Sequence, residues 1–344
     1  IFAVVEDLMQ NIFKETKNYT LEDHFVRIPW AECMRRFGSD KPDMRFGNEI
    51  QDITSVFENT EFQVFKNTIE NGGIVNCVKF ENAADKYSRK GLDQLQDFVK
   101  HGFKAKALAY LKMESDVLTG SIAKVLSEEE KAKLVEQLGL TNNDLVLVIA
   151  DNARIVQASL GALRVRLGHE LNLIPTETTY KFLWVTDFPM FEYSEEDERW
   201  VAAHHPFTAP KEEDVDKLFT DPGHVSSRAY DLVLNGYELL SGSIRIHSQE
   251  LQAKVFEAIG LSLEDAKARF GFFLDSFRYG TPPHGGVGIG LERLIMVLAG
   301  TDNIRDVVAF PTTNSSFDLM SEAPNVVDKK QLDILGIEIS KQEK

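Results

Sequence analysis

Apolar and polar positions along the chain predict a mixture of helices and strands. Apolar residues recur at helical spacing from Phe2 to Phe13, so residues 1–16 are expected to form an amphipathic helix. Ser127 followed by Glu130 is a capping box, which marks the start of another helix. The expected helices are 1–16, 88–101, 127–139, 153–171, 248–259, 264–276 and 291–299.

Short apolar runs predict strands between these helices. Residues 145–150 are continuously apolar, as is typical of a strand buried on both faces. Residues 192–199 are charged and are expected to form a hairpin or loop, and 24–52 are loop-like apart from one strand. The expected strands are 25–30, 62–65, 73–80, 107–112, 145–150, 182–185, 230–246 and 284–290.

The elements between residues 53 and 155 form a self-contained α+β group of about 100 residues, enough for a domain. We therefore predict the fold class α+β, with the chain divided into 1–52, 53–155 and 156–344. The central segment is expected to interrupt a domain formed by the other two.

Composition narrows the class of protein. With 344 residues, 43% of them hydrophobic, the chain can bury a large core and is not expected to be disordered. A formal charge of −16 argues against non-specific binding to nucleic acids or membrane surfaces, although it leaves room for a local basic groove. Two cysteines cannot form a disulfide framework, which indicates a reducing compartment. We expect no membrane span or signal peptide.

The beginning of the chain suggests a fragment. The first residue is Ile1 rather than Met, and the helical pattern starts at once without an N-cap residue. We therefore expect an upstream part to precede this chain.

Asn235-Gly236 between alternating residues is a strong signal for a β-hairpin with a two-residue turn. Such a turn pairs Val233 with Glu238, Leu232 with Leu239 and Asp231 with Leu240. Asp231 and Glu238 then share one face and are close enough to hold one Mg²⁺ ion against substrate phosphates. The alternative interpretation of the spacing alone is a surface hairpin with a salt bridge.

Arg245 follows in the same strand with the opposite parity to Glu238. The Ser241-Gly242-Ser243 segment is expected to supply a bulge or bend that re-aims the strand. An arginine beside two carboxylates either pairs with them or binds a planar anion of the substrate.

Residues 284–293 combine a glycine-rich strand with the start of an apolar helix. Gly286, Gly288 and Gly290 alternate, so they present bare backbone on which a flat ring can lie. Arg293 in the first helical turn favours phosphate. The spacing fits neither the Rossmann nor the P-loop motif, and a tight turn before an ordinary helix is the alternative.

His204-His205-Pro206-Phe207 is a third candidate site. Adjacent histidines point in different directions and do not readily chelate one metal, and a single histidine is more often structural than catalytic. A histidine can still be the positive or hydrogen-bond-donating partner of an anionic substrate. The zincin pattern and the G-x-S-x-G elbow of serine hydrolases are absent from the sequence.

Gly286-x-Gly-x-Gly-x-x-Arg293 before an apolar helix resembles motif 3 of the class II aminoacyl-tRNA synthetases. With other segments in order along the chain, it resembles the bacterial-type aspartyl-tRNA synthetases over essentially the whole length. Those segments are 38–43, 200–208, 231–238, 242–247, 278–284 and 302–306. Segment 53–155 resembles the domain that these enzymes share with an amidotransferase subunit.

The resemblance implies a class II antiparallel sheet flanked by helices, interrupted by the inserted α+β domain. It implies a ligase that activates L-aspartate with ATP to aspartyl-adenylate and transfers the aspartyl group to the 3'-terminal adenosine of tRNA(Asp). Mg²⁺ as cofactor, a homodimer and a cytoplasmic location are implied as well. Catalysis would rest on positioning and charge stabilisation, so no residue is expected to act as a covalent catalyst.

The resemblance also implies residue roles. His204 and Arg245 would bind aspartate, with Arg245 holding its side-chain carboxylate through a bidentate pair. Asp231 and Glu238 would hold Mg²⁺. The residues expected to bind ATP, with Arg293 at the γ-phosphate, are Glu238, Gly290, Leu291, Glu292 and Arg293.

The sequence departs from the family pattern in two respects. Leu239-Leu240-Ser241 stands where the family commonly has a more glycine-rich link. Motifs 1 and 2 and the anticodon-binding barrel are missing, so we expect a C-terminal part with little ligase activity alone. An asparaginyl-type or asparagine-forming relative, and a non-catalytic RNA- or protein-binding fragment, are the alternatives.

Overall fold

The computed structural model describes residues 1–175 and 179–340. The chain divides into two units, Ile1–Gly290 and Leu291–Lys344, and each is described by itself. Within the described residues, the structure contains no helix of the length and apolar character needed to cross a bilayer.

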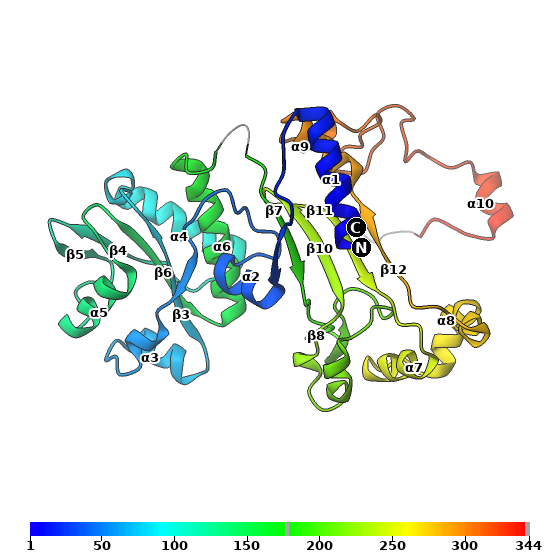
Figure 1. Ribbon diagram of the computed structural model, residues 1–344, viewed down its shortest axis with the longest axis horizontal. Coiled ribbons are helices and arrows are strands. Elements are labelled where there is room, and N and C mark those ends of the chain that lie inside the picture. Colours follow the sequence, from blue (N-terminus) through cyan, green and yellow to red (C-terminus); the bar gives the residue numbers. More distant parts are fainter. Residues whose placement is uncertain (176–178, 341–344) are drawn as a thin grey trace. The chain divides into compact units, whose positions relative to one another are not determined.

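The first sheet of the first unit has the order β1-β7-β10-β11-β12, of which Figure 1 labels β7, β10, β11 and β12. Strands β1 and β7 are parallel, and the other neighbours are antiparallel. The bounds are β1 (Val26–Pro29), β7 (Phe182–Thr186), β10 (Ala229–Leu234), β11 (Tyr237–Ile244) and β12 (Gly285–Ile289).

Helices cover the two faces of this sheet. On one face lies α1 (Phe2–Lys17), whose Phe2 stacks on Trp184 with ring centroids 4.1 Å apart. On the other face, α2 (Trp30–Phe37) buries Cys33 and Phe37 against β7 and β10. The second face is the one that also carries the candidate site.

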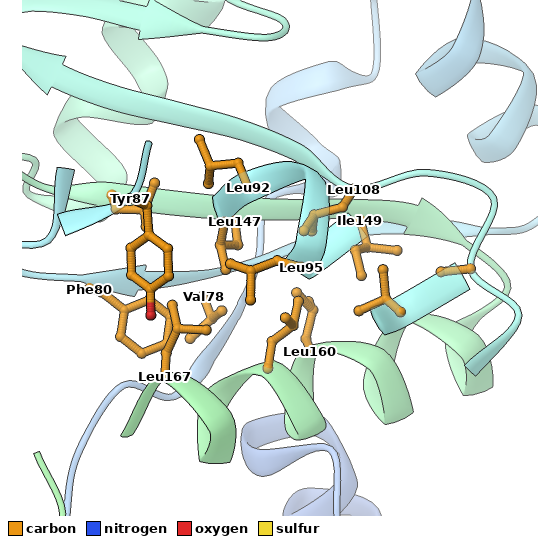
Figure 2. Close-up of a cluster of buried hydrophobic side chains, with 14 of the residues drawn as sticks. Val78, Phe80, Tyr87, Leu92, Leu95, Leu108, Leu147, Ile149, Leu160 and Leu167 are labelled. Carbon is orange, nitrogen blue, oxygen red and sulfur yellow. The ribbon is translucent and has the colours of Figure 1, made fainter. Parts of the chain in front are cut away.

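A second sheet in the same unit has the order β2-β3-β6-β4-β5. Its central strand β6 is almost wholly buried, as its apolar run predicts. Helices α4 and α6 form a core on one face (Figure 2), and α3 and α5 form another on the opposite face. The bounds are β2 (Ile50–Asp52), η1 (Thr54–Phe57), α3 (Gln63–Glu70), β3 (Ile74–Phe80), η2 (Ala84–Lys86), α4 (Arg89–Phe103), β4 (Ala109–Glu114), β5 (Val117–Gly120), α5 (Glu128–Leu138), β6 (Leu145–Asp151) and α6 (Ala153–Glu170).

Much of this second sheet lies within residues 53–155, but its elements extend beyond both ends of that range. Strand β2 starts at Ile50 and pairs with β3, and α6 continues to Glu170 while packing on the same core. Helix α6 also contacts α2, so it links the two sheets.

The remaining elements of the first unit flank the first sheet. They are β8 (Phe191–Ser194), β9 (Arg199–Ala202), η3 (Glu212–Lys217), η4 (Pro222–His224), α7 (Gln249–Ala258), α8 (Leu263–Ser276) and η5 (Phe277–Tyr279). The second unit contains α9 (Leu291–Ala299), η6 (Ile304–Asp306) and α10 (Lys329–Leu335).

The α+β class is confirmed, as are the expected helices and most of the strands. The strand predicted at 62–65 is wrong, because these residues begin helix α3, which buries Phe65. A short apolar run fits either element, and here Phe62, Phe65 and Ile69 pack at helical spacing against the second core. Helix α2 within 24–52 was not predicted either. The capping box is confirmed, with Ser127 Oγ accepting from the Glu130 N–H.

Candidate functional site

The hairpin β10–β11 has the predicted two-residue turn but a different register beyond it. Val233 pairs with Glu238 as expected, whereas the expected partners of Leu232 and Asp231 are wrong. Leu232 pairs with Leu240 and Asp231 with Ser241, because Leu239 is an extra residue opposite the Leu232–Val233 step. The hairpin therefore contains a β-bulge at Leu239.

The bulge decides which face Arg245 occupies. Side chains alternate along a strand, so one extra residue reverses the parity of everything after it. Ser241 pairs with Asp231, and Ser243 and Arg245 follow at intervals of two. Arg245 thus comes to the face of Asp231 and Glu238. The expected bend exists, but it lies at Leu239 rather than at Ser241-Gly242-Ser243.

A cavity of about 340 Å³ opens on this face. Its walls come from β10, β11 and the segment before residue 209. The lining residues are His204, His205, Thr208, Ala229, Ser241, Gly242, Ser243 and Arg245.

His205 contacts Arg245 directly. Arg245 Nη1 lies 3.0 Å from His205 Nδ1 and is within hydrogen-bonding reach of Nε2, and Thr208 Oγ1 is 3.3 Å from Nδ1. Burial, together with the positive charge of Arg245, lowers the pKa of His205 to about 4. A neutral His205 is able to accept a hydrogen bond from the guanidinium. The sequence pointed to His204 and did not reveal the contact between His205 and Arg245. Two adjacent histidines have the same chemistry, and only the structure shows where each ring points.

His204 lines the same cavity from another side. Its ring meets Phe188 edge-on at 5.1 Å, although much of the residue remains exposed. Partial burial lowers the pKa of His204, while the nearby carboxylates of Asp40, Glu238 and Glu192 act in the opposite direction. His204 therefore faces the acidic part of the site.

Asp231 is a buried carboxylate, with 6% of the residue exposed. Burial raises its pKa to about 6; a hydrogen bond from Ser241 opposes this shift, and the charges of Glu238 and Asp40 add to it. Its Oδ1 atom is buried and has no hydrogen-bond partner among the described residues. An unpartnered carboxylate oxygen next to a second carboxylate fits a bound cation. Within residues 1–175 and 179–340, no group of three or more His, Cys, Asp and Glu side chains is arranged to hold a metal.

The glycine strand β12 lies beside the same face. Gly286 pairs with Ser243 and Gly288 with Ser241, so both glycines turn toward the site. A Cβ at Gly286 would meet nothing within 4 Å, which leaves bare backbone there. Gly290 N–H donates to the carbonyl of the bulge residue Leu239 at 2.7 Å and anchors the end of the strand.

A family model for class II tRNA synthetases (D, K and N) matches residues 1–314. The chain belongs to this family.

Two curated relatives of this chain are named as ligases that join aspartate to tRNA. The aspartate–tRNA ligase of Listeria monocytogenes is 50% identical over 343 residues, which cover 100% of this chain and 58% of that protein. The aspartate–tRNA(Asp/Asn) ligase of a Geobacillus species is 48% identical over 344 residues, with the same coverage. The chain thus spans about 58% of the length of these relatives.

A solved aspartyl tRNA synthetase from Entamoeba histolytica is 17% identical to this chain, with a TM-score of 0.33. The matched region covers 91% of this chain and 58% of the Entamoeba chain. That likeness is too low to bear on the site.

The synthetase chain brings most of the predicted site residues together in its first unit. Asp231, Glu238 and Arg245 share one face, His204 lines the cavity there, and Gly290 is tied to the bulge. The other predicted residues, Leu291 to Arg293, form the first turn of α9 in the second unit.

Proposed function

We propose that this chain is the part of an aspartate–tRNA ligase that recognises L-aspartate and binds the phosphates of ATP. The observation that carries the proposal is the bulge at Leu239, which puts Arg245 on the face of Asp231 and Glu238. A site for aspartyl-adenylate formation needs a cation for the amino-acid side chain and carboxylates near the phosphates, and one sheet face offers both. The names of relatives 48–50% identical to the chain support the same activity.

In this proposal Arg245 binds the side-chain carboxylate of aspartate through two parallel N–H···O bonds. Asparagine would present an amide N–H₂ to one edge of the guanidinium, which has donors only, so the pair discriminates between the two amino acids. His205 accepts from Nη1 and thereby limits the orientations of the guanidinium. His204 supplies a further contact to aspartate.

Asp231 and Glu238 would hold Mg²⁺, whose charge, when bound, offsets that of the ATP phosphates. Gly290, Leu291, Glu292 and Arg293 would bind ATP, with Arg293 at the γ-phosphate. The α-carboxylate of aspartate then attacks the α-phosphorus as the bond to pyrophosphate breaks. The residues of this chain hold the two reactants in line and supply no covalent intermediate.

We further propose tRNA(Asp) as the second substrate, a homodimer as the active form, a cytoplasmic location, and residues 53–155 as an inserted domain. Both cysteines, Cys33 and Cys77, are buried and free, which suits a reducing compartment.

The test is Arg245→Lys in the complete gene product, measured by amino-acid-dependent ATP–pyrophosphate exchange. Lysine keeps the charge but loses the planar fork, so we expect exchange with aspartate to be abolished. Arg199→Lys, at an exposed position on β9, is the matched control and should leave exchange unchanged. Pyrophosphate exchange at the wild-type level in the Arg245→Lys variant would falsify the proposal. So would a wild-type protein that exchanges with asparagine instead of aspartate.

The name of the Geobacillus relative favours a second candidate, a ligase that charges both tRNA(Asp) and tRNA(Asn). Charging of the two purified tRNAs by the complete gene product separates the candidates. Aspartylation of tRNA(Asp) alone supports the first, and comparable aspartylation of both supports the second.

A further inference from the structure

Arg164 is the most deeply buried cation among the described residues, with 1% exposed. Its guanidinium donates to backbone carbonyls of one segment: Nη2 to Asp43 at 2.9 Å, to Phe46 at 2.8 Å and to Gly47 at 2.9 Å. Nε donates to Asn48 O at 3.1 Å. The group also lies 4.0 Å from the centroid of the Phe46 ring. Burial lowers the pKa of Arg164 to about 10, so it remains charged at neutral pH.

The same segment is held at its other end by a close backbone crossing. A Cβ at Gly161 of α6 would lie 2.7 Å from the carbonyl oxygens of Gly38 and Phe37. A Cβ at Gly38, whose φ is +65°, would lie 2.0 Å from Gln157 O. Residues 38–48, here named the bracket, are therefore fixed to α6 at both ends.

The bracket in turn lies next to the turn of the β10–β11 hairpin. A Cβ at Gly236, the second turn residue, would lie 3.5 Å from Asp43 Cβ. The Asp43 side chain is held in place by Arg45, with Oδ2 and Nη2 2.7 Å apart. The charges of Asp40 and Lys41, near the start of the bracket, also act on the pKa of Asp231.

We propose that Arg164 is a positioning residue, which through the bracket fixes the hairpin that carries Asp231 and Glu238. Helix α6, which packs on the second sheet, is thereby coupled to the candidate site on the first. In its catalytic part this inference rests on the proposed function.

A buried charge is a costly way to fill space, because an apolar side chain of similar volume often serves stability as well or better. A planar guanidinium also fixes geometry, because its N–H donors point in set directions and bind several carbonyl groups at once. An otherwise irregular loop thus obtains a single conformation.

The first experiment is hydrogen–deuterium exchange on the complete gene product. Arg164→Lys keeps the charge but removes most of the N–H donors that bind the backbone carbonyls. Gly161→Ala pushes the other end of the bracket away from α6. We expect both variants to accelerate exchange about tenfold, equivalent to about 1.4 kcal/mol, in residues 38–48 and in the hairpin turn 234–238.

The matched controls lie in the same domain. Arg166→Lys changes a more exposed arginine on α6, and Gly91→Ala fills a helix position where the new Cβ would lie 3.5 Å from its nearest neighbour, Tyr87 Cδ1. Both should leave the hairpin unchanged. Faster exchange in the bracket with an unchanged hairpin, or equal acceleration in the controls, would overturn the inference.

The second experiment measures aspartate-dependent ATP–pyrophosphate exchange by the complete gene product. Arg164→Lys should lower kcat about tenfold and leave KM for aspartate within about twofold, since Arg245 is untouched. An unchanged kcat would overturn the catalytic part. If the wild type shows no such exchange, the proposed function fails, while hydrogen exchange still decides the role of Arg164.

Discussion

Replacing Asp231 with asparagine should stabilise the protein at neutral pH and do so less as the pH falls. The wild-type carboxyl has a pKa of about 6 in the folded chain, against an ordinary value of 3.8. Between these values the folded chain holds more protons than the unfolded chain, so its stability decreases as the pH rises. Asparagine carries no charge at any pH and escapes this cost.

The magnitude follows from the two pKa values. At about 1.36 kcal/mol per pKa unit, the raised pKa of Asp231 costs about 3 kcal/mol of stability at pH 7.5 and about 1.6 kcal/mol at pH 5, where the folded carboxyl is mostly protonated. The difference in unfolding free energy between variant and wild type should therefore shrink by about 1.4 kcal/mol between the two pH values. Any cost of accommodating the asparagine amide is the same at both and cancels.

Urea unfolding followed by tryptophan fluorescence, in buffer with a chelator, measures this difference. Trp184 is fully buried on β7, the neighbour of β10, and reports on the same sheet. Asp93→Asn, on the exposed side of α4, is the control and should show no such pH dependence. A difference that stays constant or grows as the pH falls would refute the argument that Asp231 is buried with an unfavourable charge.

Three further predictions concern stability in the same urea assay. Gly242→Ala should cost about 1–3 kcal/mol, because the new Cβ would lie 2.1 Å from the carbonyl oxygen of Gly286. Gly288→Ala should be tolerated, because the nearest atom to its new Cβ is 3.9 Å away. Equal losses in both would contradict this account of the β11–β12 contact. Tyr230→Phe should cost about 1 kcal/mol by removing the 3.1 Å hydrogen bond to Gly286 O. Ser127→Ala should cost about 1 kcal/mol through the lost N-cap of α5, and an unchanged unfolding midpoint would show that the cap contributes nothing.

Local patterns along the chain were sufficient for most elements of the fold. The α1 stripe, the apolar run of β6 and the α5 capping box each depend on neighbours within a few residues, and each is found where expected. The failure at 62–65 has the same origin, since a four-residue apolar run has no period long enough to separate strand from helix.

The candidate site required more than local patterns. The Asn235-Gly236 turn and the first pair, Val233 with Glu238, follow from the sequence. The bulge at Leu239 does not, because leucine carries no bulge signal and the sequence pointed to the glycine three residues later. The contact between His205 and Arg245 joins residues 40 positions apart and has no local signature.

The sequence by itself determined the chemistry available to this protein: two carboxylates, an arginine, a histidine pair and a glycine strand, in an order that resembles one enzyme family. The tertiary structure decided which of these groups meet. The physical reason is the period of two in a β-strand, through which one inserted residue transfers Arg245 from one face to the other. The structure also joined Arg164 to Asp43, 121 positions apart, because a buried guanidinium takes its partners from whatever backbone packs against it.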